Sequence, residues 1–522
     1  MRVRSDQGRS LSGLCELRDE REVLAFVAML AGSILLDAVV HPRPQLPLLP
    51  VGRSLVGLWL QFLLLITVFG LFQAGTGNSA ASAVLTLAVM SLLVVVSNAK
   101  SAMLGEPLMF SDLALIVAVF RHPQFYMSAL RPWQTVALAG GAVAMLAVLG
   151  QQFVLSLAPH LIGAGLILAA LCMITVSLRL SPWRAIMVDP NAIKDVRRHG
   201  LLPTLLVYWW RWRASADPEP IGPVQRAADT VGGTPQVVVI VQCESFADPV
   251  ELFENPALEL PGLAAARAAA WQTGRLQVSG FGAYTMRTEY GLLFGRSEEA
   301  LGFRRYDPFG TAVRETSYAL PNRISGIDWR SLFLHPHDMR FYGRHRIMPA
   351  SGFSELVGES RFAAPLPGEG RYVTDAAMAA EIVTLARAAT NPTLLYAVTI
   401  ENHGPWTARN SATDDGAGLT SGVLAQGYLH LAQNSDAMLT MLMAELATLE
   451  RPAMLVFFGD HRPSIPGVSM PGGDRHTPYV MVCFDEAGRI VQGDKRELDL
   501  TPAELHHAII DVLAGGMAAG KG

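Results

Sequence analysis

Residues 453–463 read AMLVFFGDHRP, and this stretch decides how the rest of the chain is interpreted. The apolar run 453–458 stops at Gly459, which predicts a short buried strand that ends in a turn. Asp460 and His461 follow directly. Polar side chains just past the carboxyl end of a strand lie where open α/β sheets bind their ligands. A carboxylate beside an imidazole is also a suitable ligand pair for a divalent metal.

Two other predicted strands end in residues of the same kinds. Glu244 follows the β-branched run 237–241, and His403 follows the apolar run 394–400. Taken singly, Glu244 is more often a turn residue and His403 more often a hydrogen-bonded structural histidine. An isolated Asp-His pair can likewise be a helix cap beside a surface histidine. Their common position at strand ends is what points to one shared site.

A fourth segment adds a hydroxyl. Residues 280–289 read GFGAYTMRTE, a glycine-rich turn that leads into a helical pattern. Thr285 lies at the expected helix N-terminus, where backbone N–H groups and the helix dipole favour anions. Threonine is a weak nucleophile, and coordination to a metal is one recognised route to activate it. The alternatives are that Thr285 is only a helix cap, or that Thr288, one turn further on, is the nucleophile.

Composition divides the chain into two regions. A length of 522 residues exceeds the usual size of one domain. Hydrophobic residues make up 51% of the chain, and nearly all the long apolar runs lie in residues 1–180. A net charge of −4 argues against a general nucleic-acid binder, which would show a basic footprint. The four cysteines form no C-x-x-C pair, which argues against a disulfide framework.

Residues 23–178 contain five apolar stretches, each near the ~20 residues that cross a bilayer as a helix. They predict a polytopic helical membrane domain, with residues 1–22 in the cytoplasm and residues 179–234 as an interfacial helix and linker. Residues 235–522 would then lie outside the cytoplasm, although a sixth crossing through Leu113–Phe120 would reverse this. The stretches are Val23–Val40, Leu55–Gln73, Ala80–Ser97, Trp133–Leu155 and Leu161–Leu178.

The linker and the region after it have different patterns. Leu201–Trp212 ends in YWWRW, and tryptophan mixed with arginine suits a helix in the headgroup region. The alternative is a buried aromatic helix beneath the soluble domain. Ala214–Pro235, with its Pro, Gly and Asp, is expected to be a flexible boundary. Beyond it, strands alternate with helical patterns at Asp375–Ala389 and Gly422–Leu449, which predicts a three-layer α/β domain.

These residues in this order resemble the lipoteichoic acid synthase and phosphoglycerol transferase family of the alkaline phosphatase/sulfatase superfamily. The resemblance covers essentially the whole chain and implies a sulfatase-like catalytic domain outside the membrane. It implies that Thr285, followed four residues later by Glu289, is the nucleophile. Glu244, Thr285, Asp460 and His461 match the family's metal ligands. The implied metal is Mn²⁺, with Zn²⁺ or Mg²⁺ as alternatives.

The resemblance also implies residues that bind the head group. His335, Tyr342 and Arg344 have the spacing of a histidine, an aromatic residue and an arginine that grip phosphoglycerol in the family. Tyr342 stands where lipoteichoic acid synthases usually have tryptophan, which bears on head-group selectivity. A guanidinium can bind phosphate through two parallel hydrogen bonds. The alternative for Arg344 is an ordinary surface arginine.

Two further histidines match family segments. His403, in the sequence ENHGP at residues 401–405, matches the histidine that contacts the phosphate. His476, in DRHTP at residues 474–478, resembles a residue that related transferases bring to the phosphate or to a second metal. Both are expected to bind substrate.

The function implied is a membrane-bound, metal-dependent phosphoglycerol transferase in a bacterial inner membrane, with a periplasmic catalytic domain. Phosphatidylglycerol would be the donor, and an envelope glycan or a polyglycerolphosphate chain the acceptor. One alternative is a phosphoethanolamine transferase, although those relatives usually have a disulfide-rich catalytic domain and this one has only Cys243 and Cys483. A sulfatase-like hydrolase is a second, although no Cys/Ser-x-Pro-x-Arg motif precedes Glu289. A non-catalytic protein that binds anionic glycans is a third.

Overall fold

The protein is described from a computed structural model. The chain divides into two compact units, one of Met1–Ala102 and Glu106–Ser215, the other of Met103–Gly105 and Ala216–Gly522. The structure describes residues 6–44, 52–113, 140, 147, 150–224, 233–324, 329–406, 421–472, 474–491 and 496–515.

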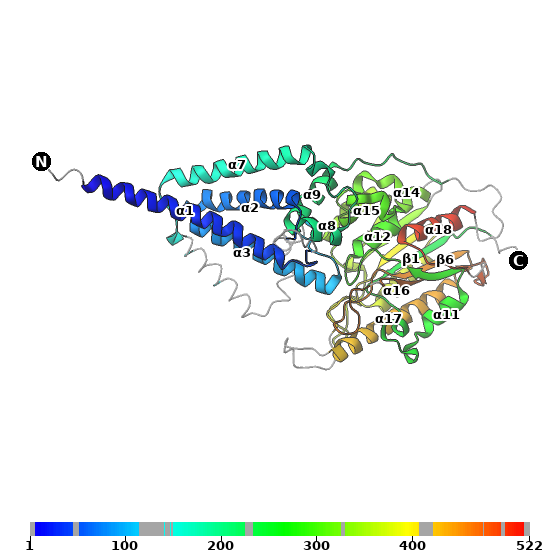
Figure 1. Ribbon diagram of the computed structural model, residues 1–522. Helices are drawn as coiled ribbons and strands as arrows, with labels where there is room; N and C mark the ends of the chain where they lie inside the picture. The colour runs from blue at the N-terminus through cyan, green and yellow to red at the C-terminus, as the bar shows by residue number, and fades with distance from the viewer. Residues whose placement is uncertain are drawn as a thin grey trace. The chain divides into compact units, whose positions relative to one another are not determined.

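The first unit is helical, and three of its described helices are long and apolar enough to cross a membrane (Figure 1). They confirm the second, third and fifth predicted stretches as helices. The first predicted stretch lies in α1 (Asp6–Ala38) except for its last two residues. The fourth, Trp133–Leu155, falls largely outside the described residues, so the number of five crossings stays a prediction. The three candidate spans are α2 (Leu55–Thr76), α3 (Ser79–Leu104) and α7 (Leu157–Arg179).

The one charge within the predicted apolar stretches, Asp37, is buried against Arg53. Arg53 Nε donates to Asp37 Oδ2 at 2.6 Å, and Nη1 donates to the carbonyl oxygens of Val196 at 2.8 Å and Arg197 at 2.9 Å. A buried charge is tolerated when it is paired and hydrogen-bonded. The pair therefore fastens the end of α1 to the helix α8 (Ala192–His199).

The predicted interfacial helix is α9 (Leu201–Ala214). Its Tyr208 is buried, and the Tyr208 hydroxyl donates to Asp195 of α8 at 2.6 Å. Its C-terminal end carries the aromatic and basic side chains, and the Arg213 guanidinium lies 5.6 Å from the ring centroid of Trp209. One face of the helix is therefore packed within the first unit, while Trp209 stays 42% exposed.

The second unit is built on one sheet, in which the described strands follow the order β4-β3-β5-β1-β6-β7-β2-β9 with β8 beside β7. Strands β4, β3, β5, β1 and β6 run parallel, and β7 is antiparallel to β6. The strands are β1 (Val237–Cys243), β2 (Gln272–Leu276), β3 (Arg330–Leu334), β4 (Glu355–Val357), β5 (Thr393–Val398), β6 (Ala453–Gly459), β7 (Thr477–Phe484), β8 (Ile490–Val491) and β9 (Arg496–Glu497).

The central strands are apolar throughout because both faces of the sheet are covered. In β1, Val238 and Ile240 pack into one core cluster, while Val237, Val239 and Val241 pack into another on the opposite face. This alternation follows from the two-residue repeat of a strand. The arrangement confirms the predicted three-layer α/β domain, with the sheet between two sets of helices (Figure 1).

Helices on the two faces come from different parts of the chain. The first core cluster takes residues from α12 (Thr285–Phe294), α14 (Leu320–Ile324), α15 (Arg344–Ala350) and α18 (Pro502–Gly515). The second takes residues from α11 (Pro261–Ala269), α16 (Asp375–Arg387) and α17 (Ser421–Leu446). The predicted helices at Asp375–Ala389 and Gly422–Leu449 are thus confirmed, with ends that differ by a few residues. Two short helices, α10 (Pro249–Phe253) and α13 (Glu298–Leu301), lie in the connections.

Part of the expected flexible boundary is held on the second unit by hydrogen bonds. Arg304 Nη2 donates to Asp217 Oδ1 at 2.6 Å, and the Tyr318 hydroxyl donates to the carbonyl oxygen of Glu219 at 2.8 Å. The backbone N–H of Val224 donates to a carbonyl of the same domain at 2.8 Å. The expectation of flexibility is therefore wrong for this part, because Pro, Gly and Asp content does not reveal partners that lie far along the sequence.

Candidate active site

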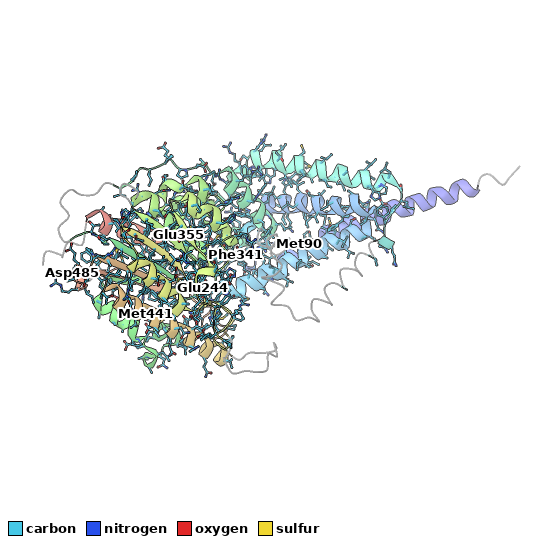
Figure 2. All side chains as sticks on the ribbon, turned by 180° about the vertical axis from the view of Figure 1, so that it is seen from behind. Met90, Glu244, Phe341, Glu355, Met441 and Asp485 are labelled. Carbon is cyan, nitrogen blue, oxygen red and sulfur yellow. The ribbon has the colours of Figure 1, made fainter. Side chains whose placement is uncertain are left out.

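The ends of β1 and β6 bring two carboxylates together. The two strands are parallel, and their register pairs Cys243 with Gly459, so Glu244 and Asp460 are the next residues on each. The Asp460 N–H donates to the Cys243 carbonyl at 3.1 Å, and the Ser245 N–H donates to Asp460 Oδ1 at 2.8 Å. These backbone bonds hold both acidic side chains at the carboxyl edge of the sheet, where Figure 2 labels Glu244.

Glu244, Asp460 and His461 form the one cluster of metal-ligand type within the described ranges. Their candidate ligand atoms all lie within 4.8 Å of one another, and all three residues are buried. His461 Nε2 is 3.4 Å from Glu244 Oε1 and 3.6 Å from Asp460 Oδ2. Two carboxylate oxygens and one imidazole nitrogen at this spacing form a partial coordination shell for a divalent cation.

The cluster is short of positive charge, which a metal ion would supply. Asp460 Oδ2 is buried and has no hydrogen-bond partner. Burial, with the charge of Glu244, raises the pKa of Asp460 to about 7. Burial lowers the pKa of His461, but the carboxylates of Asp460 and Glu244 outweigh it and raise that pKa overall. The donor set and the partnerless oxygen therefore fit a divalent metal.

Thr285 lies beside this cluster, at the first position of α12. Its Oγ1 is 3.5 Å from His461 Nε2. The preceding residue, Tyr284, has φ 80°, a left-handed conformation that is strained for a residue with a bulky side chain. The guanidinium of Arg287 lies 3.9 Å from the Tyr284 ring centroid and holds the ring in place. The sharp turn presents the Thr285 hydroxyl at the helix N-terminus, where backbone N–H groups favour an anion.

Thr288, the alternative nucleophile, is buried and already engaged. Its hydroxyl donates to the backbone carbonyl oxygen of Asp460 at 2.8 Å, and its exposed fraction is 1%. A hydroxyl held in this way fixes the loop that carries Asp460 and His461. The geometry favours Thr285 over Thr288 as the residue that can meet a substrate.

Arg344 is buried in a two-bond pair with Glu289, a partner that the sequence does not reveal. Arg344 Nε donates to Glu289 Oε1 at 3.1 Å, and Nη2 donates to Glu289 Oε2 at 2.6 Å. The two side chains are 2% and 0% exposed. The alternative interpretation of Arg344 as a surface arginine is therefore wrong. Its predicted contact with phosphate stays a prediction.

His335 and Tyr342 lie around Arg344. His335 is buried, its Nδ1 is 3.0 Å from the carbonyl oxygen of Val398, and burial lowers the pKa of its imidazole well below the usual range. It is therefore neutral at physiological pH. Tyr342 has φ 56°, and its ring centroid lies 5.3 Å from the Arg344 guanidinium. Substrate binding by His335 and Tyr342 stays a prediction.

His403 is exposed, on the loop that follows β5. Its Nδ1 is 2.8 Å from the carbonyl oxygen of Gly404, and its ring centroid is 5.8 Å from that of Tyr372. The Tyr372 ring is in turn 6.5 Å from that of His337. Neither Tyr372 nor His337 belongs to a motif in the sequence, so sequence interpretation missed both. Because Nδ1 contacts the carbonyl oxygen of Gly404, Nε2 is the His403 ring nitrogen that remains for a ligand.

His476 is placed in a separate polar cluster rather than among Glu244, Asp460 and His461. Its Nε2 is 2.6 Å from Glu251 Oε2 and 2.9 Å from Arg462 Nη2. Arg462 Nε also donates to the His476 carbonyl oxygen at 2.8 Å. Glu251, on α10, carries no sequence signal and was missed. The predicted role of His476 in substrate binding remains untested by this geometry.

The two cysteines of the second unit have no catalytic setting. Cys243 and Cys483 are both buried and unpaired. Burial raises the pKa of both thiols, which keeps them protonated and unreactive. Cys243 packs in one of the two core clusters.

A buried carboxyl pair beside the site predicts a pH-dependent stability. Burial, reinforced by the charge of Glu401 and more weakly of Glu244, raises the pKa of Asp375 to about 8, against about 3.9 in an unfolded chain. The Ser435 hydroxyl donates to Asp375 Oδ2 at 2.6 Å and opposes this shift only in part. The folded protein thus keeps a proton that the unfolded chain loses. The stabilisation is complete below about pH 4 and is lost as the pH rises towards about 8.

We expect Asp375→Asn to flatten this decline, because the amide cannot titrate. Melting temperatures of the full-length protein across about pH 5 to about pH 9 would show a shallower slope than in the parent chain. Glu298→Gln, at a half-exposed position of α13, is the matched control and should leave the slope unchanged. Equal slopes in parent and Asp375→Asn proteins would contradict the prediction.

The chain is similar to several characterised proteins. It is 28% identical over 467 residues to the capsular polysaccharide biosynthesis protein RkpI of Rhizobium meliloti. The matched residues cover 84% of this chain and 84% of that protein. The integral membrane lipooligosaccharide phosphoethanolamine transferase A (EptA) of Neisseria meningitidis is 12% identical with a TM-score of 0.51 over 87% of this chain and 95% of that one. The phosphoglycerol transferase GacH of Streptococcus pyogenes is 16% identical with a TM-score of 0.42 over 54% and 75% of the two chains.

At this identity, the likeness to EptA shows a shared fold across both the helical region and the catalytic domain. Residues 236–512, more than half of the chain, match the Sulfatase family. That range begins at β1 and includes Glu244, Thr285, Asp460 and His461. The protein belongs to the sulfatase family and joins a sulfatase-like catalytic domain to a helical membrane domain.

Proposed function

We propose that this protein is a phosphoglycerol transferase that moves a phosphoglycerol group from phosphatidylglycerol to an acceptor in the cell envelope. The observation that carries the proposal is the Thr285 hydroxyl at the start of α12, 3.5 Å from His461 in a cluster that fits a divalent metal. The similarity to a capsular polysaccharide biosynthesis protein over 84% of the chain supports an envelope glycan as acceptor. The apolar helices support a lipid donor.

A divalent cation, for which we propose Mn²⁺, would be held by Glu244, Asp460, His461 and Thr285. When bound, it would lower the pKa of the threonine hydroxyl and offset charge on a phosphoryl oxygen. The chain itself supplies a fixed position for that hydroxyl, because the strained Tyr284 turn places Thr285 at the N-terminus of α12. The Thr288 hydroxyl holds the loop of Asp460 in position by its hydrogen bond to the Asp460 carbonyl oxygen.

In the first half-reaction, Thr285 Oγ1 attacks the phosphorus of the donor phosphodiester. The bond between phosphorus and the diacylglycerol oxygen breaks, and a covalent phosphoglycerol-threonine remains. The threonine loses its proton and the departing diacylglycerol oxygen gains one, so protons balance. The N–H groups at the start of α12 stabilise the charge that develops on the phosphoryl oxygens.

In the second half-reaction, an acceptor hydroxyl attacks the same phosphorus. The bond to Thr285 Oγ1 breaks, the threonine regains a proton, and the phosphoglycerol group is transferred. We propose that His403 contacts a non-bridging oxygen, because it is exposed on the loop after β5. Arg344 would contribute positive charge from within its pair with Glu289, and His335, Tyr342 and His476 would complete the substrate contacts.

We further propose that the protein lies in a bacterial inner membrane with its catalytic domain in the periplasm. The proposed boundaries are a cytoplasmic segment at residues 1–22, membrane helices in 23–178, an interfacial helix and linker in 179–234, and the catalytic domain in 235–522. A periplasmic enzyme would meet the lipid head group and the envelope acceptor in the same compartment. A C-terminal reporter active only in the cytoplasm would contradict this topology.

The experiment is an intact-mass measurement of the purified full-length protein after incubation with phosphatidylglycerol and Mn²⁺. We expect a phosphoglycerol adduct on the parent chain and none on Thr285→Ala. The adduct would establish the donor, the nucleophile and the two-step chemistry together. If neither an adduct nor diacylglycerol release occurs, phosphatidylethanolamine is the donor to test next, because the protein shares its fold with a phosphoethanolamine transferase.

A further inference from the structure

The catalytic domain has a second feature beside the metal-type cluster, a cavity of about 290 Å³ between the end of β5, the start of α16 and α17. Its polar lining includes the carboxylates of Glu369 and Glu401 and the side-chain amide of Asn434, and Met441 lies on its apolar side. Among the described residues that line it, none is Lys, Arg or His. The volume is close to the lower end of the range for small-ligand sites, about 300 Å³.

The cavity and the candidate active site lie at the ends of neighbouring strands of the sheet. Strands β5 and β1 are paired, and the N–H of Glu244 donates to the hydroxyl of Thr399 at 3.0 Å. Glu401 lies two residues further along the same strand end as Thr399. His403 follows in the same loop, and its ring centroid is 5.8 Å from that of Tyr372. Tyr372 comes shortly before the start of α16, which forms one wall of the cavity. One edge of the sheet therefore carries both the metal-type cluster and the cavity.

The polar groups of the cavity are held in place and keep capacity for a ligand. Glu401 is 5% exposed, and its oxygens accept from the N–H of Asp375 at 2.7 Å and from Asn434 Nδ2 at 2.9 Å. A carboxylate has about four acceptor sites, so two fixed bonds leave room for hydroxyl donors. Asn434 Nδ2 is committed to Glu401, which leaves its amide oxygen as a further acceptor. Glu369 is fixed in a similar way by the N–H of Leu366 at 2.8 Å.

We propose that this cavity is the acceptor subsite and that it binds a neutral sugar residue of a glycan. The inference rests on the proposed transfer reaction and names its acceptor. Hydroxyl groups of a sugar are donors that suit carboxylate and amide oxygens, and its C–H face suits the side of Met441. The subsite lies on the sheet edge from which Thr285 would pass the phosphoglycerol group to an acceptor hydroxyl.

The two possible acceptors, a neutral glycan and a polyglycerolphosphate chain, differ in charge. A polyglycerolphosphate chain carries one negative charge for each repeat. In this cavity it would meet Glu369 and Glu401, with no Lys, Arg or His among the described lining residues and the His430 imidazole near Glu401. Like charges at short range oppose binding, and discrimination by repulsion is a common source of specificity. A neutral glycan avoids this repulsion.

The test is direct binding, measured on the full-length Thr285→Ala protein in detergent with Mn²⁺, so that no chemistry takes place. The probes are a panel of neutral hexose and N-acetylhexosamine oligosaccharides and, separately, polyglycerolphosphate fragments, titrated by calorimetry. We expect saturable binding of a neutral oligosaccharide that polyglycerolphosphate does not displace. Absence of saturable binding by every neutral oligosaccharide, or displacement by polyglycerolphosphate, would overturn the proposal.

A cavity-filling variant localises the binding. Ala376 lines the cavity and is exposed on α16, so Ala376→Trp can fill the space without disturbing the core. Ala380, one turn further along the same helix, is exposed and does not line the cavity, and Ala380→Trp is the matched control. We expect affinity for the oligosaccharide to fall at least about tenfold, or 1.4 kcal/mol, in the first variant and to stay unchanged in the second.

Ala437→Trp fills the same cavity from α17 and covers the case in which Ala376→Trp does not fold. Equal affinity in a folded cavity-filling variant and in Ala380→Trp would overturn the assignment of the site. This result is separate from the proposed reaction, which stands or falls on the Thr285 adduct with phosphatidylglycerol in the parent chain. A chain that forms the adduct but binds no neutral glycan would keep the reaction and lose the inference.

Discussion

Thr285→Ala is expected to abolish transfer, with kcat lower by on the order of 10⁴-fold or more, the scale seen when a catalytic nucleophile is removed. The physical reason is that Thr285 Oγ1, at the start of α12, lies 3.5 Å from His461 of the cluster, whereas the Ser245 hydroxyl donates to Glu244 and the Thr288 hydroxyl donates to the Asp460 carbonyl oxygen. Release of diacylglycerol from phosphatidylglycerol in detergent measures the loss. Manganese content, measured on the same samples, should change much less, because the three clustered ligands remain.

Thr288→Val is the matched control for that experiment. Valine keeps the shape of threonine but removes the hydrogen bond to the Asp460 carbonyl, which leaves a buried acceptor unsatisfied. Such a loss costs about 1–3 kcal/mol of stability. We therefore expect a lower melting temperature, and a loss of kcat that is much smaller than in Thr285→Ala because the Thr285 hydroxyl remains. A large loss of kcat for Thr288→Val, with Thr285→Ala still active, would reverse the assignment of the nucleophile.

Glu289→Gln is expected to cause the largest loss of stability among single substitutions near the site. The Arg344 and Glu289 side chains are at most 2% exposed. The substitution therefore leaves the Arg344 guanidinium buried without a counter-charge. Breaking a buried ion pair from one side typically costs about 3–5 kcal/mol. Thermal unfolding of the full-length protein, followed by circular dichroism at constant metal concentration, measures the change.

The ion pair between Arg340 and Asp338, on the segment of Arg344, provides the control, with the Arg340 side chain 60% and the Asp338 side chain 17% exposed. Arg340 bonds to Asp338 through its guanidinium. Asp338→Asn should therefore cost at most about 1 kcal/mol, as surface ion pairs do. The double variant Glu289→Leu with Arg344→Met removes both charges and should regain part of the stability. A melting temperature for Glu289→Gln no lower than that of Asp338→Asn would contradict the prediction.

The sequence alone was enough to place the main parts of the candidate site. The apolar runs before Glu244, His403 and Asp460 predicted three strands, and β1, β5 and β6 are adjacent and parallel in the sheet. Parallel strands bring their carboxyl ends to one edge, so residues distant in sequence meet without any further information. The glycine-rich turn before Thr285 was equally readable, because glycine and the helix pattern are local signals.

Contacts between side chains that are far apart in the sequence could not be predicted in this way. Nothing near Glu289 identifies Arg344 as its counter-charge, and nothing near Asp375 identifies Glu401. His476 was assigned to the substrate by its motif, whereas its closest described contacts are Glu251 and Arg462. These pairings depend on which side chains the packing of helices on the sheet brings together, and no local pattern encodes that.

The sequence by itself determined that a helical, apolar region precedes an α/β domain, and it brought forward Glu244, Thr285, Asp460 and His461 as candidates for one site; the sulfatase-like class rested on the family resemblance. Hydropathy, strand length and turn chemistry are properties of short segments, so they can be read from the chain directly. Only the tertiary structure decided that Thr288 is engaged, that Arg344 is buried against Glu289, and that an acidic cavity adjoins the site. Each of these depends on burial and on contacts between distant segments, which exist only once the sheet and its two layers of helices have assembled.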